Sequence, residues 1–424
     1  MSMISVEEAL AYVLKHFSPL APERVALLES LDRVLAEDVL ADMNVPPLDN
    51  SAMDGYAVRA ADIVIASQEH PVTLRVIGDL AAGYMPDRTV EPGTAVRIMT
   101  GAVLPPGADT VVRFEETSEG AQTRGAGKGH GTVEILKAIK QGDNVRGAGE
   151  DIRKGKVVLP KGTVIRPSEI GVLASIGQAQ VLVHRRPRVA ILATGDELVD
   201  VTDPVTPGKI RNSNEYTNAA AVTKVGGIPI RLGIARDNIQ DLKAKIKSGL
   251  DQQADLFITS AGVSVGDYDM VKDVLSSEGE IQFWQVRMKP GKPLAFGILR
   301  KEGGPGVPLL GLPGNPVSAM VSFEMFARAA ILTMLGKTKF TRPTVRAVLL
   351  DQATNDSNRR NFIRVHVGKE NGRIVARTTG EQGSGILTSL SRANGLLVIP
   401  ENVGTVPPGE TVDVQMLDWP ETDL

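Results

Sequence analysis

The sequence predicts a multi-domain protein of the α/β plus β class, on three observations. The chain has 424 residues, too many for one hydrophobic core, because cores stop growing near roughly 250–300 residues. Strand and helix patterns alternate through residues 185–338, which predicts a parallel, doubly wound sheet covered on both faces. Short β-rich runs with Gly/Pro turns fill 43–141 and recur over 339–424, which predicts a β-rich insertion domain and a separate C-terminal β domain.

The N-terminal segment predicts two helices. Ser5 and Glu8 form a capping box for a helix over 5–17. The apolar stripe of this helix is Val6, Leu10, Val13 and Leu14. A second helix is expected over 22–35, with an inward stripe of Val25, Leu28, Leu31 and Leu35.

The middle of the chain predicts strands. Within the insertion the β-rich runs are VTLRVIG, AVRIM, DTVVRFEE and TVEILKAI. The Gly-rich stretch 119–131 is expected to form a hairpin tip. Short strands and turns return over 142–184, as in GKVVLPKGTVIRP. Four domains follow: an α/β domain (1–17 plus 185–338), a discontinuous linker domain (18–42 plus 142–184), the β-rich insertion domain (43–141) and the C-terminal β domain (339–424).

In the α/β domain the elements alternate regularly. The expected strands are RVAILAT, IPIRLGIA, DLFITS, FWQVRM and PLLGL. The expected helices are NEYTNAAAVTKVGG, DNIQDLKAKIKSGLDQQ, MVKDVLSSEG and the long segment 315–335.

Composition excludes several classes of protein. The chain has no cysteine and five histidines without paired ligand spacing, so thiolate metal sites and disulfides are excluded, and a hard cation such as Mg²⁺ on carboxylates is expected. A net charge of -3 and an aromatic content of 4% argue against nucleic-acid binding. The N-terminus lacks a signal-peptide pattern, and no apolar run approaches the roughly 20 residues of a membrane span. We therefore expect a cytoplasmic protein that binds neither nucleic acid nor membrane.

Candidate ligand groups follow the strands of the α/β domain, where such sheets bind ligands. They are Gly195-Asp196-Glu197, Arg236-Asp237, the loop 261–269 and the segment 313–318. Glycines let backbone N–H groups approach a phosphate, and carboxylates can hold the same phosphate through Mg²⁺. Lys289 and Lys292 could neutralise an oxyanion. Together these groups predict a metal–phosphate site at one edge of the sheet.

Simpler interpretations exist for each residue taken alone. Asp237 could cap the helix that follows it, and Asn315-Pro316 fits an N-cap and first-turn pair. Glu197 could cap its own loop, and the two lysines could be solvated surface residues. No Walker pattern, nucleophile elbow or strand-linked G-x-G-x-x-G occurs, so common NTPase, hydrolase and dinucleotide functions lack support.

Seven segments, in order, resemble the molybdopterin molybdotransferase family, which includes the E domain of gephyrin. They are the runs PPLDNSAMDGYA (46–57), IMTGA (98–102), GEDI (149–152), TGDEL (194–198), the loop 262–269, KPGKP (289–293) and GLPGNPVS (311–318). A single short Gly/Pro motif is weak evidence for a family. Here seven segments occur in the family's order and spacing, and the resemblance covers nearly the whole chain.

The resemblance implies a molybdopterin-binding α/β domain, a C-terminal β-barrel-like domain and a homodimer. It implies molybdenum cofactor biosynthesis, in which adenylylated molybdopterin and molybdate give the cofactor and AMP with Mg²⁺. Transient contact with molybdopterin adenylyltransferase and with acceptor molybdoenzymes is also implied.

The resemblance further implies roles for individual residues. It assigns catalytic roles to Asp54, Thr100, Asp151, Glu197, Asp237 and Asp269. Of these, Asp269 and Glu197 would also bind the metal. The pterin substrate would contact Gly195, Ser260, Gly262, Ser264, Gly266, Pro313, Gly314, Asn315 and Pro316. Molybdate would be held by Lys289, Lys292, Arg364 and Ser389.

Three positions depart from the family pattern. Ala261 stands where a second glycine is common, Asn212 where an acidic residue is common, and Gln285 where some members have a basic residue. Two alternative functions stay open: an ATP-dependent molybdopterin adenylyltransferase, whose fold resembles the α/β domain, and a non-catalytic cofactor-binding scaffold.

Overall fold

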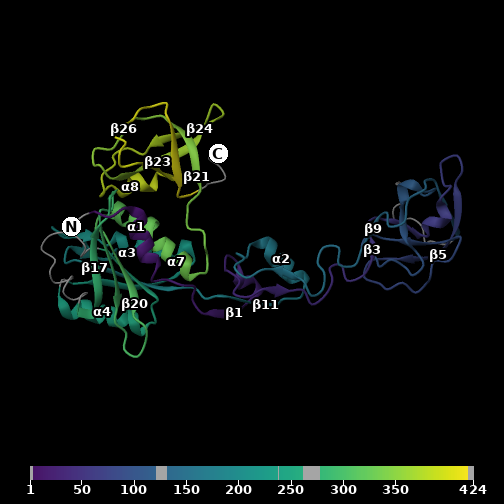
Figure 1. Ribbon diagram of the computed structural model, residues 1–424, viewed down its shortest axis with the longest axis horizontal. Helices are drawn as coiled ribbons and strands as arrows, with labels where there is room; N and C mark the ends of the chain where they lie inside the picture. Colours follow the sequence, from purple (N-terminus) through teal and green to yellow (C-terminus); the bar gives the residue numbers. More distant parts are fainter. Residues whose placement is uncertain (1–2, 121–130, 237, 261–276, 419–424) are drawn as a thin grey trace. The chain divides into compact units, whose positions relative to one another are not determined.

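The computed structural model describes residues 3–120, 131–236, 238–260 and 277–418. The chain divides into two compact units (Figure 1). Unit 1 comprises Met1–Arg24, Asp32–Ala36 and Leu182–Leu424; unit 2 comprises Val25–Leu31 and Glu37–Val181. The finer division into four domains stays a prediction.

A six-stranded sheet forms the centre of unit 1. Its order is β15 (Ile228–Ala235), β12 (Arg188–Thr194), β16 (Leu256–Ser260), β20 (Val307–Leu312), β19 (Pro293–Leu299) and β17 (Gly279–Gln285). The first four strands are parallel, but β19 runs antiparallel to both its neighbours. The expectation of an all-parallel sheet is therefore wrong at this edge. The connections on either side of β19 are too short for the crossover of a dozen or more residues that parallel strands need.

Helices cover both faces of this sheet (Figure 1). Side chains alternate along β12, so Val189 and Ile191 face one core while Ala190 and Leu192 face the other. The first core also contains residues of α1 (Val6–Leu14), α3 (Ser213–Val225) and the segment 316–335. The second contains α4 (Ile239–Asp251). The doubly wound arrangement is confirmed.

The N-terminal helix α1 begins as predicted, with Ser5 and Glu8 in a complete capping box, but it ends at Leu14 rather than at residue 17. It packs against the edge of the sheet: Ile4 forms a parallel bridge to Val286, and the Tyr12 ring meets Trp284 edge-on at 4.8 Å. Residues near the start of the chain thus complete a core whose other members lie between Val189 and Leu396.

The predicted helix over 22–35 is wrong. The structure has strand β1 (Pro22–Ala26) and a 3₁₀ turn, η1 (Leu27–Ser30). The supposed inward stripe does not share a buried face, because Leu28 is 79% exposed and Leu31 is 39% exposed. Leu35 is buried and forms a bridge to Val183 instead.

Unit 2 contains a five-stranded sheet in the order β7 (Thr110–Arg113), β4 (Gly55–Val58), β6 (Thr94–Ile98), β5 (Val72–Leu80) and β8 (Gly131–Ile135). All four β-rich runs predicted for the insertion form strands here. Beside the Gly-rich stretch, the Ser118 N–H donates to the Glu134 carbonyl at 2.9 Å, as a hairpin requires. The predicted tip itself, 121–130, lies outside the described residues.

The shorter elements complete the fold. They are β2 (Val39–Leu40), β3 (Asn50–Ser51), η2 (Ala60–Ile63), η3 (Phe114–Glu116), β9 (Val145–Arg146), β10 (Val157–Leu159), α2 (Pro167–Ser175), β11 (Gln180–His184), β13 (Leu198–Val199) and β14 (Ile210–Arg211). Helix α2 was not predicted, although Pro167 at its start and Glu169 in its first turn are both helix-start signals.

The C-terminal strands close into a ring, as the barrel-like expectation requires. The ring contains β23 (Arg360–Glu370), β24 (Arg373–Thr378), β21 (Thr344–Leu349), β27 (Thr411–Met416) and β25 (Gly395–Ile399), with β25 pairing back to β23. Strand β18 (Met288–Lys289) adds to β23 from outside. The remaining elements are β22 (Ala353–Thr354), α8 (Leu387–Ser391) and β26 (Thr405–Val406).

One long helical segment runs through α6 (Pro316–Ser322), the π-helical η5 (Phe323–Ala327) and α7 (Arg328–Met334). Contrary to the expectation for the sequence, Pro316–Met334 is long and apolar enough to cross a membrane by length and composition. However, its most apolar window is 72% buried within the fold, as a core helix would be.

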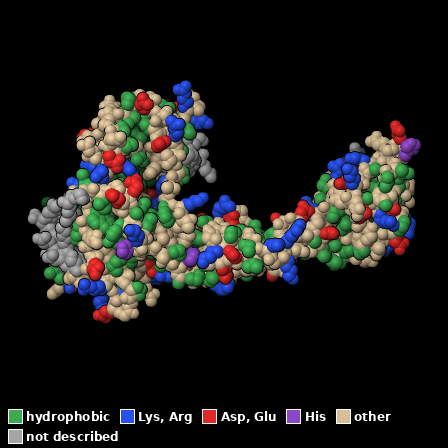
Figure 2. Space-filling view, viewed as in Figure 1, with side chains coloured by type: hydrophobic (Ala, Val, Ile, Leu, Met, Phe, Trp, Pro, Cys, Tyr) green, Lys and Arg blue, Asp and Glu red, His purple; other side chains and the backbone are tan. Residues whose placement is uncertain are grey.

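On the face shown in Figure 2, acidic and basic side chains are interspersed over both units.

Candidate functional site

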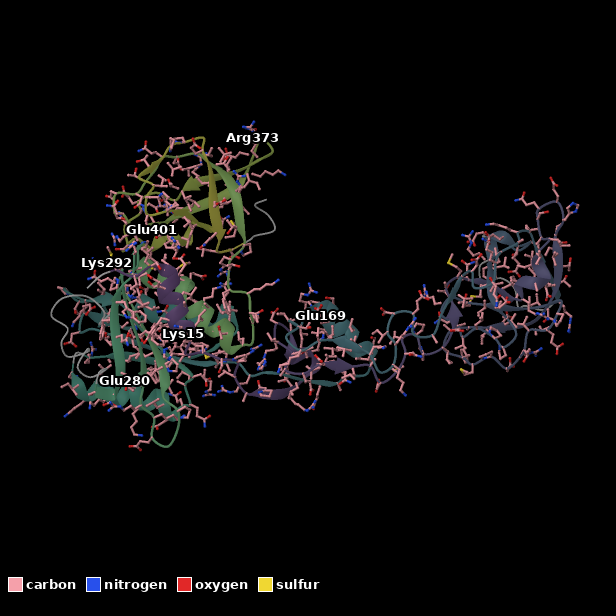
Figure 3. The ribbon with its side chains drawn as sticks, in the orientation of Figure 1. Lys15, Glu169, Glu280, Lys292, Arg373 and Glu401 are labelled. Atoms are coloured by element: carbon pink, nitrogen blue, oxygen red, sulfur yellow. The ribbon has the colours of Figure 1, made fainter. Side chains whose placement is uncertain are left out.

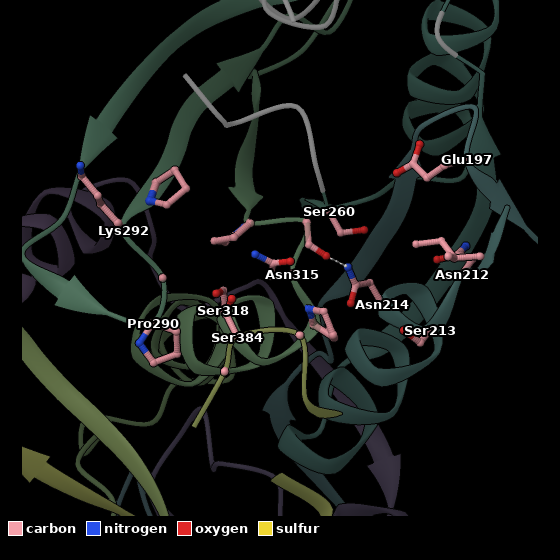
Figure 4. Close-up of a pocket in the computed structure, with 18 of the residues that line it drawn as sticks. Glu197, Asn212, Ser213, Asn214, Ser260, Pro290, Lys292, Asn315, Ser318 and Ser384 are labelled. Carbon is pink, nitrogen blue, oxygen red and sulfur yellow. Dashed lines mark hydrogen bonds between the residues drawn. The ribbon is translucent and has the colours of Figure 1, made fainter. Parts of the chain in front are cut away.

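A cavity of about 950 Å³ lies where strands β12, β16 and β20 end (Figure 4). Ser260 pairs with Ala193 on one side and with Leu312 on the other, so the three carboxyl ends lie side by side. The lining residues are Thr194, Glu197, Leu198, Ile210, Arg211, Asn212, Ser213, Asn214, Ser260, Lys289, Pro290, Gly291, Lys292, Pro293, Pro313, Gly314, Asn315, Pro316, Ser318, Arg359, Gln382, Gly383, Ser384 and Gly385. The edge predicted from the sequence is thus the edge that holds the cavity.

The cavity is electropositive. Arg211, Lys289, Lys292 and Arg359 line it, whereas Glu197 is the one carboxylate among its described lining residues. Figure 4 shows Lys292 and Glu197 on opposite sides, with Ser260 and Asn315 between them. Such a cavity can hold an anion at its cationic side and a cation-bridged phosphate near Glu197.

Gly195 makes room for the Glu197 carboxylate. Its φ is +134°, and a Cβ placed on it would lie 2.2 Å from Glu197 Oε2. Gly195 is not among the lining residues, and its contact with the pterin substrate stays a prediction. Any larger residue would displace the carboxylate.

Helix α3 begins at the cavity wall, and its N-cap is Asn212, one of the departures from the family pattern. Asn212 Oδ1 accepts from the Glu215 N–H at 3.3 Å, and Asn212 Nδ2 donates to Glu215 Oε2 at 2.8 Å. Glu215 is fully buried and also accepts from Arg231 Nε at 3.1 Å. A carboxylate therefore lies directly behind Asn212, held by it, rather than at the cavity surface.

A second helix start faces the same cavity. Asn315 is the N-cap of α6 and Pro316 its first residue, as predicted, but the Asn315 side chain makes no capping hydrogen bond. Asn214 Nδ2 donates to the Gly314 carbonyl at 2.7 Å, which ties the two helix starts together. Backbone N–H groups of both helix starts therefore border the cavity, where they favour an anion.

The two predicted lysines lie in the cavity wall (Figure 3 labels Lys292). Lys289 is paired with Asp356, with 2.7 Å between Nζ and Oδ1. This hydrogen bond lowers the pKa of the Asp356 carboxyl below its ordinary value. Lys289 and Lys292 are therefore placed as expected, although one of them already has an anionic neighbour.

Arg364 and Ser389 lie behind the wall rather than on it. Arg364 is 1% exposed; its Nε donates to Ser389 Oγ at 3.1 Å and its Nη2 to the Gly383 carbonyl at 3.1 Å. Burial lowers the pKa of Arg364 to about 10, so the guanidinium remains charged at neutral pH. Because Gly383 lines the cavity, Arg364 holds a wall segment and adds positive charge behind it. Its direct contact with molybdate stays a prediction.

The expected residues of the insertion lie in unit 2. The Asp54 Oδ1 atom accepts from both the N–H and the hydroxyl of Thr100, each at 2.8 Å. The Asp151 N–H donates to the Val45 carbonyl at 3.1 Å, and its neighbour Ile152 forms a bridge to Val45. The structure thus brings Asp54 and Thr100 together as a pair.

Several expected residues lie outside the described part of the chain: Asp237, Gly262, Ser264, Gly266 and Asp269, together with the departure Ala261. The N-cap of α4 is Asn238, whose side chain accepts from the Asp241 N–H. Gln285 ends β17 opposite Pro293 and is not a lining residue. Within the described ranges, no group of three or more Asp, Glu, His or Cys side chains could hold a metal.

Sequence reasoning missed lining residues of two kinds. Arg211 and Asn214 border α3, and a search of all helix starts, rather than only strand ends, would have found them. Arg359 and the segment 382–385 come from the C-terminal barrel, and no local pattern predicts that they reach this cavity.

Nearly all of the chain is similar to known proteins. Family models match the MoeA N-terminal region (domain I and II) at residues 4–177, a probable molybdopterin binding domain at 190–333 and the MoeA C-terminal region (domain IV) at 346–417. Two curated relatives named molybdopterin molybdenumtransferase are similar over their whole lengths. The relative from Haemophilus influenzae is 36% identical, and the match covers 97% of this chain and 98% of the relative. The relative from Bacillus subtilis is 37% identical, and the match covers 98% of this chain and 96% of the relative.

A solved structure has the same fold. The molybdopterin biosynthesis MoeA protein from Pyrococcus horikoshii OT3 aligns with a TM-score of 0.81 at 30% identity, covering 98% of this chain and 100% of that one. The matches extend through both units of the chain. The chain therefore belongs to the MoeA family, whose curated members are named molybdopterin molybdenumtransferases.

Proposed function

We propose that this chain is a molybdopterin molybdotransferase that inserts molybdate into adenylylated molybdopterin and releases AMP. The observation that carries the proposal is the cavity at the ends of β12, β16 and β20, with four cationic side chains and two helix starts around one carboxylate. Membership of the MoeA family supports the same substrates.

The chemistry of the cavity is mainly positioning and electrostatic stabilisation. Molybdate and the pterin phosphate are both anions, so bringing them together costs Coulomb energy that rises as water leaves. Lys289, Lys292 and Arg359 line the wall and would neutralise molybdate, while Arg364 adds charge from behind. The start of α3 offers N–H groups to the phosphate.

A magnesium ion fits the donor set on one side of the cavity. Glu197 is an exposed carboxylate there, and Mg²⁺ is commonly held by one or two carboxylates together with substrate phosphates. Glu197 would hold the ion, which would supply positive charge to the phosphoanhydride when bound. Gly195 keeps that carboxylate in place.

The direct test is AMP release. Purified protein is mixed with adenylylated molybdopterin, molybdate and Mg²⁺, and parallel samples omit each component. Release that requires both molybdate and Mg²⁺, with molybdenum on the pterin product, is the expected result. Formation of adenylylated pterin from ATP would instead identify an adenylyltransferase, and retention of unreacted ligand would identify a scaffold.

We further propose a homodimer, in keeping with the family resemblance. Unit 2 exposes apolar side chains that a partner could cover: Leu40 is 54% exposed and Val157, directly opposite it in the β2–β10 pair, is 50% exposed. Sedimentation of wild type and Leu40→Glu tests this, because loss of dimer in the variant is expected. A monomeric wild type would refute it. Cytoplasmic localisation is part of the same proposal and can be tested by cell fractionation.

A further inference from the structure

One of the two lysines that line the cavity, Lys289, takes part in an ion pair. Lys289 Nζ and Asp356 Oδ1 are 2.7 Å apart, with side chains 38% and 75% exposed. The Asp356 pKa is lowered first by the hydrogen bond from Lys289 and, to a smaller extent, by the charge of Arg359. One carboxylate is therefore close to two of the four cations that line the wall.

The loop that carries Asp356 is built to hold it there. Asn355 is 6% exposed; its Nδ2 donates to the Arg359 carbonyl at 2.8 Å, and its Oδ1 accepts from the Ser357 hydroxyl at 2.8 Å. Asn358 closes the turn with a φ of +50°. Asp356 is thus presented by an ordered turn around a buried side chain.

The same loop is joined to the strand that carries Lys289. Arg359 Nη1 donates to the Met288 carbonyl at 3.3 Å, and β18 pairs in parallel with β23, Lys289 lying opposite Asn361. Arg359 and Lys289 are consequently held at neighbouring positions in the wall, with Asp356 as their shared counter-charge.

An oxyanion that binds Lys289 must first take the place of this carboxylate. Exposed ion pairs contribute little to stability, so the carboxylate can leave at small cost. While it stays, it occupies the ammonium that the anion would bind.

We propose that Asp356 is a resident counter-ion of the oxyanion site, which competes with molybdate for Lys289 and so sets the affinity of the site. The proposal rests on the proposed function, because it takes molybdate as the ligand of Lys289. In this role Asp356 opposes the binding of molybdate, and the family resemblance implies no such role for it.

Molybdate uptake by equilibrium dialysis tests the proposal, using the full-length protein and molybdate alone as the probe. Asp356→Asn keeps the shape of the side chain and removes its charge. We expect it to bind molybdate about two- to five-fold more tightly than wild type, the range that an exposed ion pair allows. Asp413→Asn is the matched control, since Asp413 is an exposed carboxylate of the same barrel that lies opposite Arg346 rather than beside a lysine of the cavity wall; its affinity should equal that of wild type.

A double-variant cycle separates competition for Lys289 from general repulsion. In a Lys289→Met background, Asp356→Asn should give little or no gain, because no ammonium remains for the carboxylate to occupy. A gain that persists in that background, an equal gain in Asp413→Asn, or weaker binding by Asp356→Asn would each overturn the proposal.

Failure of the underlying function gives a different result. If neither wild type nor Asp356→Asn takes up molybdate, the oxyanion site itself is wrong and the counter-ion is wrong with it. If wild type binds molybdate and Asp356→Asn binds no more tightly, only the counter-ion role is refuted.

Discussion

Two of the buried arginines, Arg97 and Arg364, lie in different surroundings. Arg97 in the insertion sheet lies over the Phe114 ring at 4.6 Å, with Glu119 at 3.6 Å and Asp79 at 3.8 Å. Arg364 in the C-terminal barrel donates to Ser389 and to backbone carbonyls, and no carboxylate pairs with it among the described residues. The first charge is compensated within its own domain, whereas the second remains uncompensated one layer behind an electropositive cavity.

The contrast between Arg97 and Arg364 distinguishes a buried charge with a structural role from one with a functional role. Burying a cation is costly unless it is paired or hydrogen-bonded. Arg364 is hydrogen-bonded but has no paired carboxylate among the described residues, so its positive charge can act on an anion in the cavity. Substitution of each arginine tests this distinction.

Replacing the compensated arginine should damage stability most. Arg97→Met leaves the carboxylates of Asp79 and Glu119 without their cation, so we expect a loss of about 3 kcal/mol in the free energy of unfolding. Denaturant unfolding followed by circular dichroism measures this. Arg75→Met is the control, because Arg75 is exposed on the neighbouring strand and its loss should change stability by less than about 0.5 kcal/mol. Equal effects of the two variants would contradict a structural role for Arg97.

The buried carboxylate of Glu215 extends the comparison to an acidic group. Asn212→Asp, which introduces the acidic residue common in the family, replaces a donor to Glu215 with a second carboxylate. We expect a loss of about 2 kcal/mol in stability. Adding Glu215→Gln should recover a large part of the lost stability. Asn238→Asp, at the exposed cap of α4, is the control and should be nearly neutral, because Asp and Asn cap equally well.

Replacing the uncompensated arginine should damage binding instead. Arg364→Met removes positive charge behind the cavity wall, so molybdate affinity in equilibrium dialysis should fall about tenfold, or about 1.4 kcal/mol. Stability should fall less than in Arg97→Met. Arg377→Met, on the exposed side of the same barrel, should leave affinity unchanged. Unaltered affinity in Arg364→Met would show that its charge does not reach the ligand.

The smallest effect concerns an ion pair at the start of α2. Hydrogen bonds from the Arg166 guanidinium lower the pKa of Glu169 to about 2 (Figure 3 labels Glu169). Because the folded pKa lies below the ordinary value of 4.5, the stabilisation is complete above pH 4.5 and disappears as the pH falls towards 2. Acid unfolding curves of wild type and Glu169→Gln should therefore converge at low pH. A constant difference at every pH would exclude titration of this group.

The sequence allowed the main fold and much of the cavity to be predicted. The carboxyl ends of parallel strands meet at one edge whatever the strand order, so Glu197, Ser260 and the segment 313–316 could be grouped without knowing that order. Strand β19 was missed because Pro293 and Gly297 resemble turn residues. Gly297 is in fact required by close strand packing, since a Cβ there would lie 2.3 Å from the Glu280 carbonyl oxygen.

The remaining features depend on tertiary contacts that no local pattern encodes. Arg359 and Gly383 reach the cavity only because the barrel borders the α/β sheet within unit 1. Arg364 was expected to touch the ligand, but its distance from the surface follows from the packing of the loop in front of it. The apolar spacing over 22–35 fitted a helix, yet Leu28 and Leu31 face outward because the fold offers that segment no common core.

The pairing of Ile4 with Val286 also determines the order in which the molecule can be completed as it is made. A ribosome adds roughly 5–20 residues per second, so the first helix waits on the order of tens of seconds before its partner strand emerges. The insertion sheet, whose strands all lie between residues 55 and 135, is finished in the meantime. The nascent chain therefore carries a folded middle and an unburied N-terminal stripe of Val6, Ala9 and Val13 for most of its synthesis. This interval is when the chain most needs protection from aggregation.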